Sequence, residues 1–365
     1  MESVKERHMF PGNNTSAGFF SYYQYILPQS DAEHIFCIKG GPGVGKSTFM
    51  SAIAKALSES GVGVEYLHCS SDPDSLDGVL FPKLGVALVD GTAPHVIDPK
   101  NPGAVDEIVN LGEYWNLGGI KQNKKQIIDI NAETGRLFSR AYRYLAAAKC
   151  VLDDITHICG SPETDFGARA QADMIIEKEM GKASASAFQG KTRKMFASAI
   201  TPSGIVHHIE TLFDDTYKVY LITNTWGAGV NALLERIADD ASAGGHDAEV
   251  YYCPMDPEGK IEHLIIPDLR LALLSENDYL TMSVKPDCII DLTQYNGKAE
   301  QGYDREDRRV SEKEFDALLT EAVFTLRRAK ETHDELEKFY VPNMDFAKVE
   351  RTREWILGRI MEHVK

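Results

Sequence analysis

Residues 40 to 48 combine glycines, a lysine and two hydroxyl groups at a spacing suited to binding phosphate. The segment reads Gly40-Gly-Pro-Gly-Val-Gly-Lys46-Ser47-Thr48 and satisfies the pattern GxxxxGK[ST]. Its glycines allow backbone N–H groups to converge on phosphate oxygens, Lys46 adds a positive charge for the β- and γ-phosphates, and the Ser47 hydroxyl is placed to ligate magnesium. The residues expected to bind a nucleotide are Gly41, Pro42, Gly43, Val44, Gly45, Lys46, Ser47 and Thr48.

A magnesium-bound nucleotide also requires a carboxylate at the end of a neighbouring strand. The run Val86-Ala-Leu-Val-Asp90-Gly91 offers four apolar residues followed by an acid. We therefore expect Asp90 to ligate the metal together with Ser47, and Lys46 and Asp90 to be the catalytic residues. Asp-Gly is also a common turn dipeptide, so a turn is the alternative role for Asp90.

The segments on either side of the loop follow the order that this motif requires. An apolar run from Ile35 to Ile38 leads into the loop, and such runs are typical of strands buried on both faces. Residues 49 to 57 leave the loop as a run of helix-forming residues. The N-terminus of that helix would add the positive end of its dipole to the phosphate site. The sequence thus predicts a strand, a phosphate-binding loop and a helix.

The second half of the chain repeats the first at a nearly constant offset. Residues 34–73 align without gaps to residues 218–257, and eleven of the forty positions are identical. Matches also occur before and after this block, in the same order and at offsets that drift only from 186 to 181. We interpret the chain as a tandem duplication. The matches before the block include Arg7 with Arg193, Met9 with Met195, Phe10 with Phe196 and Thr15 with Thr201.

The second copy of the loop has lost the residues that carry the chemistry. It reads Thr225-Trp-Gly-Ala-Gly-Val-Asn-Ala232, so Lys46 and the hydroxyls have no counterpart. In the alignment of the two repeats Ser275 stands opposite Asp90, so the second copy has lost both the acid and the lysine. The loss of both residues together indicates that Asp90 and Lys46 serve the same site. We expect the second site to be empty or structural, although its two glycines could still shape a phosphate or nucleotide pocket.

Each repeat alternates strands with helices, which is typical of a parallel sheet. The predicted fold is α/β, with two duplicated P-loop NTPase domains, each a largely parallel sheet flanked by helices and followed by a C-terminal helical segment. A stretch rich in small residues, 181–190, sets the boundary. The first domain, 1–185, carries the intact loop, and the second, 186–365, carries the degenerate one. The expected strands are 35–38, 64–69, 86–89 and 108–111, and in the second copy 219–222, 248–253, 271–274 and 289–292.

Two further features are repeated in both halves. Apolar residues from Leu137 to Ile155 recur every three or four positions, which indicates a helix whose stripe packs in a core or between the repeats. Arg7 and Arg193 occupy matching positions before each first strand. By symmetry, one of them could reach a bound γ-phosphate as an arginine finger.

Composition limits the classes of partner. The formal charge of −16 would repel a phosphate backbone, so nucleic-acid binding is not expected. No stretch is apolar enough to span a membrane, and the charged residues 1–7 lead into no apolar signal core, so we expect a cytoplasmic protein. Six scattered cysteines without a CxxC pair indicate reduced structural thiols.

At the loop the chain resembles P-loop NTPases. The tandem arrangement, together with the segment 84–95 that follows the first site, resembles that of an uncharacterised bacterial family. Its members are called ATPases or ATP-binding proteins. The resemblance implies nucleotide binding and leaves the physiological substrate open. ATP is expected over GTP because the chain has no NKxD element, Asn123-Lys-Lys-Gln126 lacking the acid.

Three functions remain open from the sequence. The first is a Mg²⁺-dependent ATPase with one active site in the N-terminal repeat, whose hydrolysis changes how the two halves sit together. The second is a small-molecule or nucleotide kinase, since a single P-loop also serves phosphoryl transfer to an acceptor. The third is a non-hydrolysing interaction module that responds to ATP.

Overall fold

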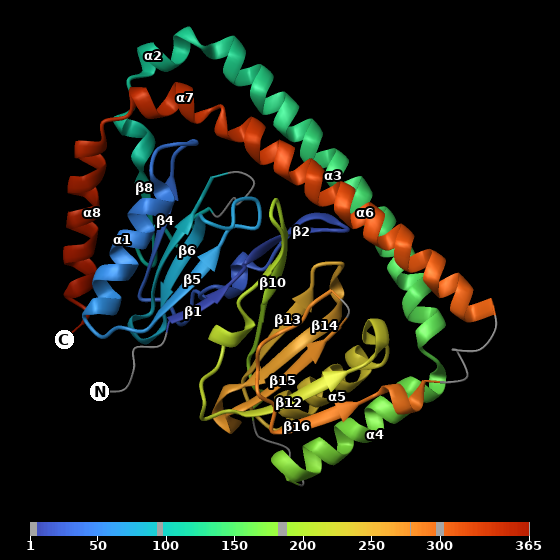
Figure 1. Ribbon diagram of the computed structural model, residues 1–365. Helices are drawn as coiled ribbons and strands as arrows, with labels where there is room; N and C mark the ends of the chain where they lie inside the picture. The colour runs from blue at the N-terminus through green and yellow to red at the C-terminus, as the bar shows by residue number, and fades with distance from the viewer. Residues whose placement is uncertain (1–5, 93–97, 182–187, 278, 297–302, 365) are drawn as a thin grey trace.

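Two six-stranded sheets form the centre of the molecule, which we describe from a computed structural model (Figure 1). The described residues are 6–92, 98–181, 188–277, 279–296 and 303–364. The predicted domain boundary at 185 lies outside them. The strand order is β1-β5-β6-β7-β4-β8 in the first sheet and β9-β13-β14-β15-β12-β16 in the second. Because corresponding strands occupy the same places, the layout is that of a duplicated mixed α/β domain.

Five strands of each sheet run in one direction, and only β6 and its counterpart β14 are antiparallel to their neighbours. The prediction of largely parallel sheets is therefore confirmed. The first sheet comprises β1 (Glu6–Met9), β4 (His34–Lys39), β5 (Val64–His68), β6 (Leu76–Phe81), β7 (Val86–Asp90) and β8 (Asp106–Asn110). The second comprises β9 (Thr192–Met195), β12 (Lys218–Thr223), β13 (Ala248–Cys253), β14 (Asp256–Ile266), β15 (Leu271–Glu276) and β16 (Cys288–Asp291).

A helix leaves each loop and packs on its sheet. Helix α1 (Lys46–Glu59) buries Phe49, Met50 and Ile53 against the first sheet. Helix α5 (Val230–Ala243) buries the equivalent face against the second sheet. Both helices therefore begin where their loop ends, close to the carboxyl end of a buried central strand.

Two long helices, one from each repeat, lie side by side along the molecule (Figure 1). They are α3 (Lys124–Cys159) and α6 (Tyr303–Asp334). The predicted stripe on α3 is buried, and its part from Ala141 to Ile155 shares a core with Phe315, Ala322 and Leu326 of α6. The stripe thus packs between the repeats, which was one of the two predicted roles.

The helices that follow this pair are exchanged between the repeats. Helix α4 (Pro162–Glu179), from the first repeat, buries Ala168, Ala172 and Ile175 in the core of the second. Helix α8 (Phe346–Met361), from the second repeat, buries Ile356 and Ile360 in the core of the first. Each sheet is consequently covered in part by the helical segment of the other repeat.

Hairpins from both repeats meet between the two sheets. They are formed by β2 (Gly12–Thr15) with β3 (Gly18–Ser21), and by β10 (Ser198–Thr201) with β11 (Gly204–His207). Phe10 and Phe196, at matching positions, exchange both backbone hydrogen bonds at 2.9 and 3.0 Å. This reciprocal pairing is the arrangement expected of two subunits related by a twofold axis.

Beside these hairpins lies an ion cluster of two arginines and two glutamates. Arg7 donates to Glu65 at 2.7 Å and also pairs with Glu249, while Arg193 donates to Glu65 at 2.6 Å. All four side chains are largely buried, with Glu65 only 3% exposed. Because both guanidinium groups are engaged between the sheets, the arginine-finger hypothesis for Arg7 and Arg193 is wrong.

Three histidines pack together close to the same place. His8 Nδ1 lies 2.9 Å from His68 Nε2, and the rings of His68 and His208 stack with their centroids 4.5 Å apart. Burial, followed by the charge of the neighbouring imidazole, lowers the pKa of His68 to about 4 and that of His208 to about 3. The cluster is therefore neutral at physiological pH.

The histidine cluster predicts acid sensitivity. An imidazole with a lowered pKa in the folded state takes up its proton more readily once unfolded, so its contribution to stability falls as pH drops from about 6.5 towards 4. For His68 alone this amounts to about 2 kcal/mol between pH 7 and pH 5. In urea unfolding at both pH values, His68→Phe should lose less stability on acidification than the native chain. The exposed His157→Phe should behave like the native chain, and an equal loss in all three would contradict the cluster's role.

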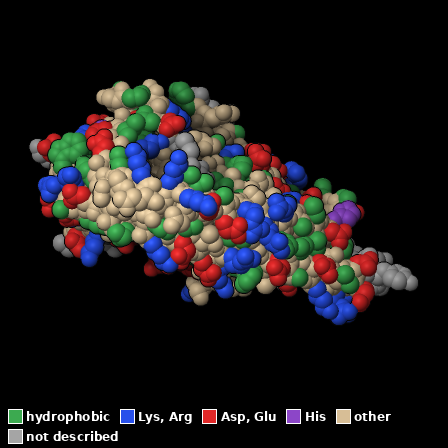
Figure 2. Space-filling view, turned by 90° about the horizontal axis from the view of Figure 1, so that it is seen from above, with side chains coloured by type: hydrophobic (Ala, Val, Ile, Leu, Met, Phe, Trp, Pro, Cys, Tyr) green, Lys and Arg blue, Asp and Glu red, His purple; other side chains and the backbone are tan. Residues whose placement is uncertain are grey.

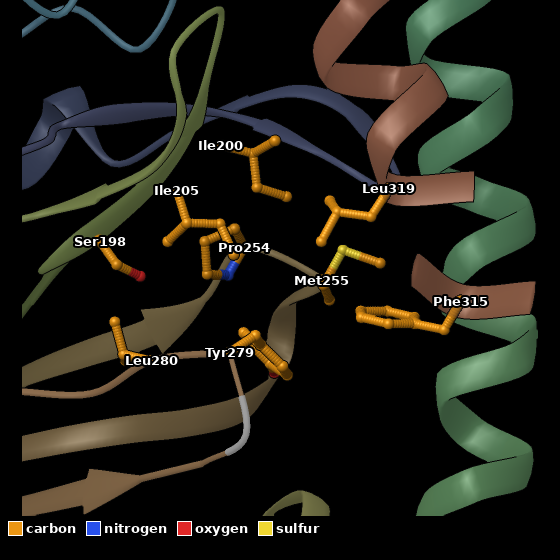
Figure 3. Close-up of a pocket in the computed structure, with 9 residues that line it drawn as sticks. All are labelled: Ser198, Ile200, Ile205, Pro254, Met255, Tyr279, Leu280, Phe315 and Leu319. Carbon is orange, nitrogen blue, oxygen red and sulfur yellow. The ribbon is translucent and has the colours of Figure 1, made fainter. Parts of the chain in front are cut away.

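One small cavity and one face of the surface carry little that points to a ligand. An apolar cavity of about 10 Å³ lies between β10, β11 and α6, and holds no more than about one water (Figure 3). Basic and acidic side chains are interspersed over the face shown in Figure 2. Within the described ranges, none of the helices has both the length and the hydropathy to cross a bilayer.

Candidate functional site

The predicted phosphate loop lies between β4 and α1 at the carboxyl edge of the first sheet. Helix α1 begins at Lys46, and Gly45 precedes it with φ of 85°. Gly43 also has a positive φ, 66°. Glycine is needed at both positions because a side chain is strained in this left-handed region. A loop with left-handed glycines before a helix N-terminus is the backbone arrangement that phosphate-binding loops use.

Lys46 and Asp90 are brought together at this edge. Lys46 Nζ donates to the carbonyl oxygens of Gly40 and Gly41 at 2.8 and 3.1 Å and lies 3.5 Å from Asp90 Oδ2. The side chains of Lys46 and Asp90 are only 13% and 12% exposed. The register explains the proximity, since Asp90 pairs with Ile38 near the end of the parallel strand β4.

The two expected metal ligands are held by backbone groups. Ser47 Oγ accepts a hydrogen bond from Leu76 N at 3.1 Å, and Asp90 Oδ1 accepts one from Thr92 N at 2.8 Å. The Thr92 bond is that of the predicted turn, while the other Asp90 oxygen faces Lys46. Both roles considered for Asp90 are therefore compatible with its position.

The second repeat covers the first loop. A Cβ added at Gly43 would lie 2.8 Å from Val341 Cγ2, and one added at Gly41 would lie 3.5 Å from the Tyr340 ring. These residues belong to α7 (Glu337–Tyr340) and the turn Val341–Asn343 that follow α6. The loop of one repeat is thus in contact with the helical segment of the other.

Two side chains of α6 extend this contact towards the loop. Lys330 Nζ lies 3.5 Å from Asp72 Oδ1, next to β5, and 2.8 Å from Asp334 of its own helix. Burial lowers the pKa of His333 on the same helix; the charges of Asp334 and Glu337 oppose this effect, and those of Lys46 and Lys330 add to it. The pair Lys330 and Asp72 is repeated in the second site by Lys149 and Asp256, 3.4 Å apart. In both sites, a lysine from the long helix of one repeat therefore pairs with an aspartate of the other repeat.

Gly43→Ala tests the contact between the repeats. The new Cβ is strained by the positive φ and also meets Val341, so we expect Gly43→Ala to destabilise the protein more than Gly61→Ala does. Gly61 is a matched control, with φ of 86° and nothing within 4 Å of an added Cβ. The expected difference in the free energy of unfolding is about 1 kcal/mol or more. Equal losses in urea unfolding would show that Val341 does not pack on the loop.

The second loop keeps the two left-handed glycines without the chemistry, and its backbone differs at Trp226, which has a positive φ of 54° where the first loop has Pro42. Gly227 and Gly229 have φ of 72° and 75°, close to the values of Gly43 and Gly45. Val230 replaces the lysine at the helix start, and Ser275 Oγ donates to the Glu262 carbonyl at 2.7 Å. The degenerate copy therefore has neither the ammonium group nor the carboxylate of the first site in these places.

The donor set of the first site suits Mg²⁺ that is bound together with a nucleotide. Among the described residues no group of three or more His, Cys, Asp or Glu side chains is arranged to hold a metal ion alone. Mg²⁺ commonly takes one or two protein oxygens and completes its shell with phosphate and water. Ser47 and Asp90 would supply those protein oxygens.

Comparison with known proteins gives one partial match. The family model described as Nephrocystin 3, N-terminal matches residues 19–79, a segment that includes the loop and α1. No curated protein and no solved structure matches the chain. The matched segment is a small part of the chain.

Proposed function

We propose that the protein binds ATP with Mg²⁺ at the loop of residues 40–48 and hydrolyses it there. The observation that carries the proposal is the placement of Lys46 and Asp90 side by side, 3.5 Å apart, at a glycine loop that opens a helix. A lysine, a hydroxyl, a carboxylate and converging backbone N–H groups form the donor set that phosphoryl transfer from a magnesium nucleotide uses.

Each residue has a role that follows from its position. The backbone N–H groups from Gly41 to Thr48 bind phosphate oxygens, and Lys46 exchanges its loop carbonyl partners for the β- and γ-phosphates. Ser47 and Asp90 hold Mg²⁺, which offsets the charge that develops on the transferred group.

The exchanged helices support a coupling between turnover and the arrangement of the repeats. Val341 and Tyr340 contact the loop, and Lys330 reaches Asp72 beside it. Phosphate entering this space must alter contacts with the second repeat, so ATP and its products would favour different placements of α6 and α7. A ligand shifts an equilibrium only through such differential contacts.

Calorimetry and turnover test this proposal on the full chain. We expect one ATP bound per chain in Mg²⁺ and much weaker binding in EDTA, together with release of inorganic phosphate. Absence of ATP binding in Mg²⁺ would overturn the proposal. Conversion of ATP to ADP without free phosphate, in the presence of an acceptor, would instead indicate a kinase, and binding without turnover would indicate an ATP-responsive module.

A further inference from the structure

The degenerate loop of the second repeat borders the larger of the two cavities described here. The cavity has a volume of about 300 Å³ and lies between the loop, α5, α3, α4 and the start of β14. This volume is at the lower end of the range for small-molecule sites. Polar residues from both repeats line it, so it is shaped by the same exchange of helices that covers the first loop.

A lysine from a different element takes the place of the missing loop lysine. Lys260, on β14, reaches the loop so closely that a Cβ added at Gly227 would lie 2.9 Å from its Nζ. Within the described parts of the chain, Lys260 makes no hydrogen bond or salt bridge, although its charge is felt by the buried carboxyl of Glu262. An ammonium group is therefore present at the curled loop and is available to an anion.

The other charges of the cavity indicate what kind of anion fits. Arg169, on α4, is a second cation with no salt bridge to any residue that the structure describes, whereas Lys149 is paired with Asp153 and Asp256. Asp165 and Glu235 add carboxylates to the lining. These carboxylates would repel a bare polyanion. A phosphate ester with hydroxyl or amino groups can instead bind the cations through its phosphate and donate hydrogen bonds to the carboxylates.

The second loop is also ready for a phosphate without a metal. Gly227 and Gly229 keep the left-handed backbone of Gly43 and Gly45, while Gly227 N donates to the Asn224 carbonyl at 3.3 Å. Asn231 Oδ1 accepts from Ile261 N at 2.8 Å, as Ser47 does from Leu76, so its side chain is held in place. Since Asn231 and Ser275 stand where the first site has Ser47 and Asp90, the magnesium ligands are missing but the two left-handed glycines remain.

We propose that the second repeat binds a phosphate ester of about the size of a nucleoside monophosphate, without Mg²⁺, through its glycine loop, Lys260 and Arg169. The site is separate from the catalytic loop and does not depend on hydrolysis there. The ligand would lie against α3 and α4 of the first repeat, so its binding would also affect how the two repeats are held together.

Calorimetry with AMP in EDTA tests the second site in a Lys46→Ala background, which isolates it from the first. We expect AMP to bind once per chain and inorganic phosphate to compete with it. Adding Lys260→Ala should weaken AMP binding about tenfold or more, since a hydrogen bond to a charged group is lost. Lys285→Ala, on an exposed loop of the same repeat, is the matched control and should leave binding unchanged.

Two results would overturn the inference. One is that the Lys46→Ala protein fails to bind AMP, whether or not it binds inorganic phosphate. The other is that AMP binds equally well with and without the Lys260 side chain. If Lys260→Ala lowers the melting temperature, Arg169→Ala provides the second variant, because Arg169 is exposed and its removal leaves the core intact. Failure of ATP hydrolysis at the first loop has no effect on either readout.

Discussion

Replacement of Lys46 by alanine is expected to abolish ATP turnover and to weaken binding of ATP with Mg²⁺ roughly 100-fold. Lys46 Nζ contacts both the loop carbonyls and Asp90, and no other ammonium of the first repeat is within salt-bridge distance of Asp90 among the described residues. Its removal leaves the β- and γ-phosphates without their principal counter-charge. Calorimetry for binding and phosphate release for turnover measure the two effects separately.

The control for Lys46→Ala is Lys55→Ala, on the same helix. Lys55 is 77% exposed and lies 4.0 Å from Glu59, so its loss should change neither binding nor turnover. Circular dichroism and melting temperature should show both variants folded. If the folded Lys46→Ala protein bound ATP with near-native affinity, the proposed role of the loop would be contradicted.

The sequence pattern predicts the local elements of each repeat well. Continuous apolar runs mark the buried strands β4 and β7, and the loop motif locates the start of α1. These features depend on residues close together in the chain, so local pattern is sufficient to find them. The position of Asp90 beside Lys46 follows from the same reasoning, since Asp90 ends β7 and the loop that leads to Lys46 follows the adjacent parallel strand β4.

Other elements carry too weak a local pattern. The antiparallel strand β6 (Leu76–Phe81) is buried throughout and contains a glycine, so it has no alternation to identify it or its direction. The short edge strand β1 (Glu6–Met9) is largely polar. Both strands exist because neighbouring strands supply hydrogen-bond partners, and sequence pattern does not show those partners.

The exchange of helices is invisible to periodicity for a different reason. The stripe on α3 identifies which residues are buried and not what they are buried against. Nothing in the sequence of α8 distinguishes packing on the first sheet from packing on the second. The sequence pattern also does not reveal Lys260, because it stands thirty residues beyond Val230, where α5 begins, and no motif links the two.

Glu65→Gln is expected to be strongly destabilising, by about 3–5 kcal/mol, since it leaves two buried guanidinium groups with Glu249 as the one remaining carboxylate of the cluster. Glu65 accepts from both Arg7 and Arg193 and is 3% exposed, so water cannot replace the lost charge. Against the opposing effect of burial, these arginines keep the pKa of Glu65 below its ordinary value. Urea unfolding at pH 7 measures the loss.

The comparison with an exposed ion pair isolates the effect of burial. Glu133 pairs with Arg136 on the surface of α3, 2.6 Å apart, and because water screens this pair, Glu133→Gln should leave the stability nearly unchanged. Because the arginines of the cluster come from different repeats, Glu65→Gln should also loosen the junction between the sheets. Hydrogen exchange would then show faster opening at Phe10 and Phe196, whose backbones pair across that junction. A small, uniform change in exchange would contradict a cluster that holds the two repeats together.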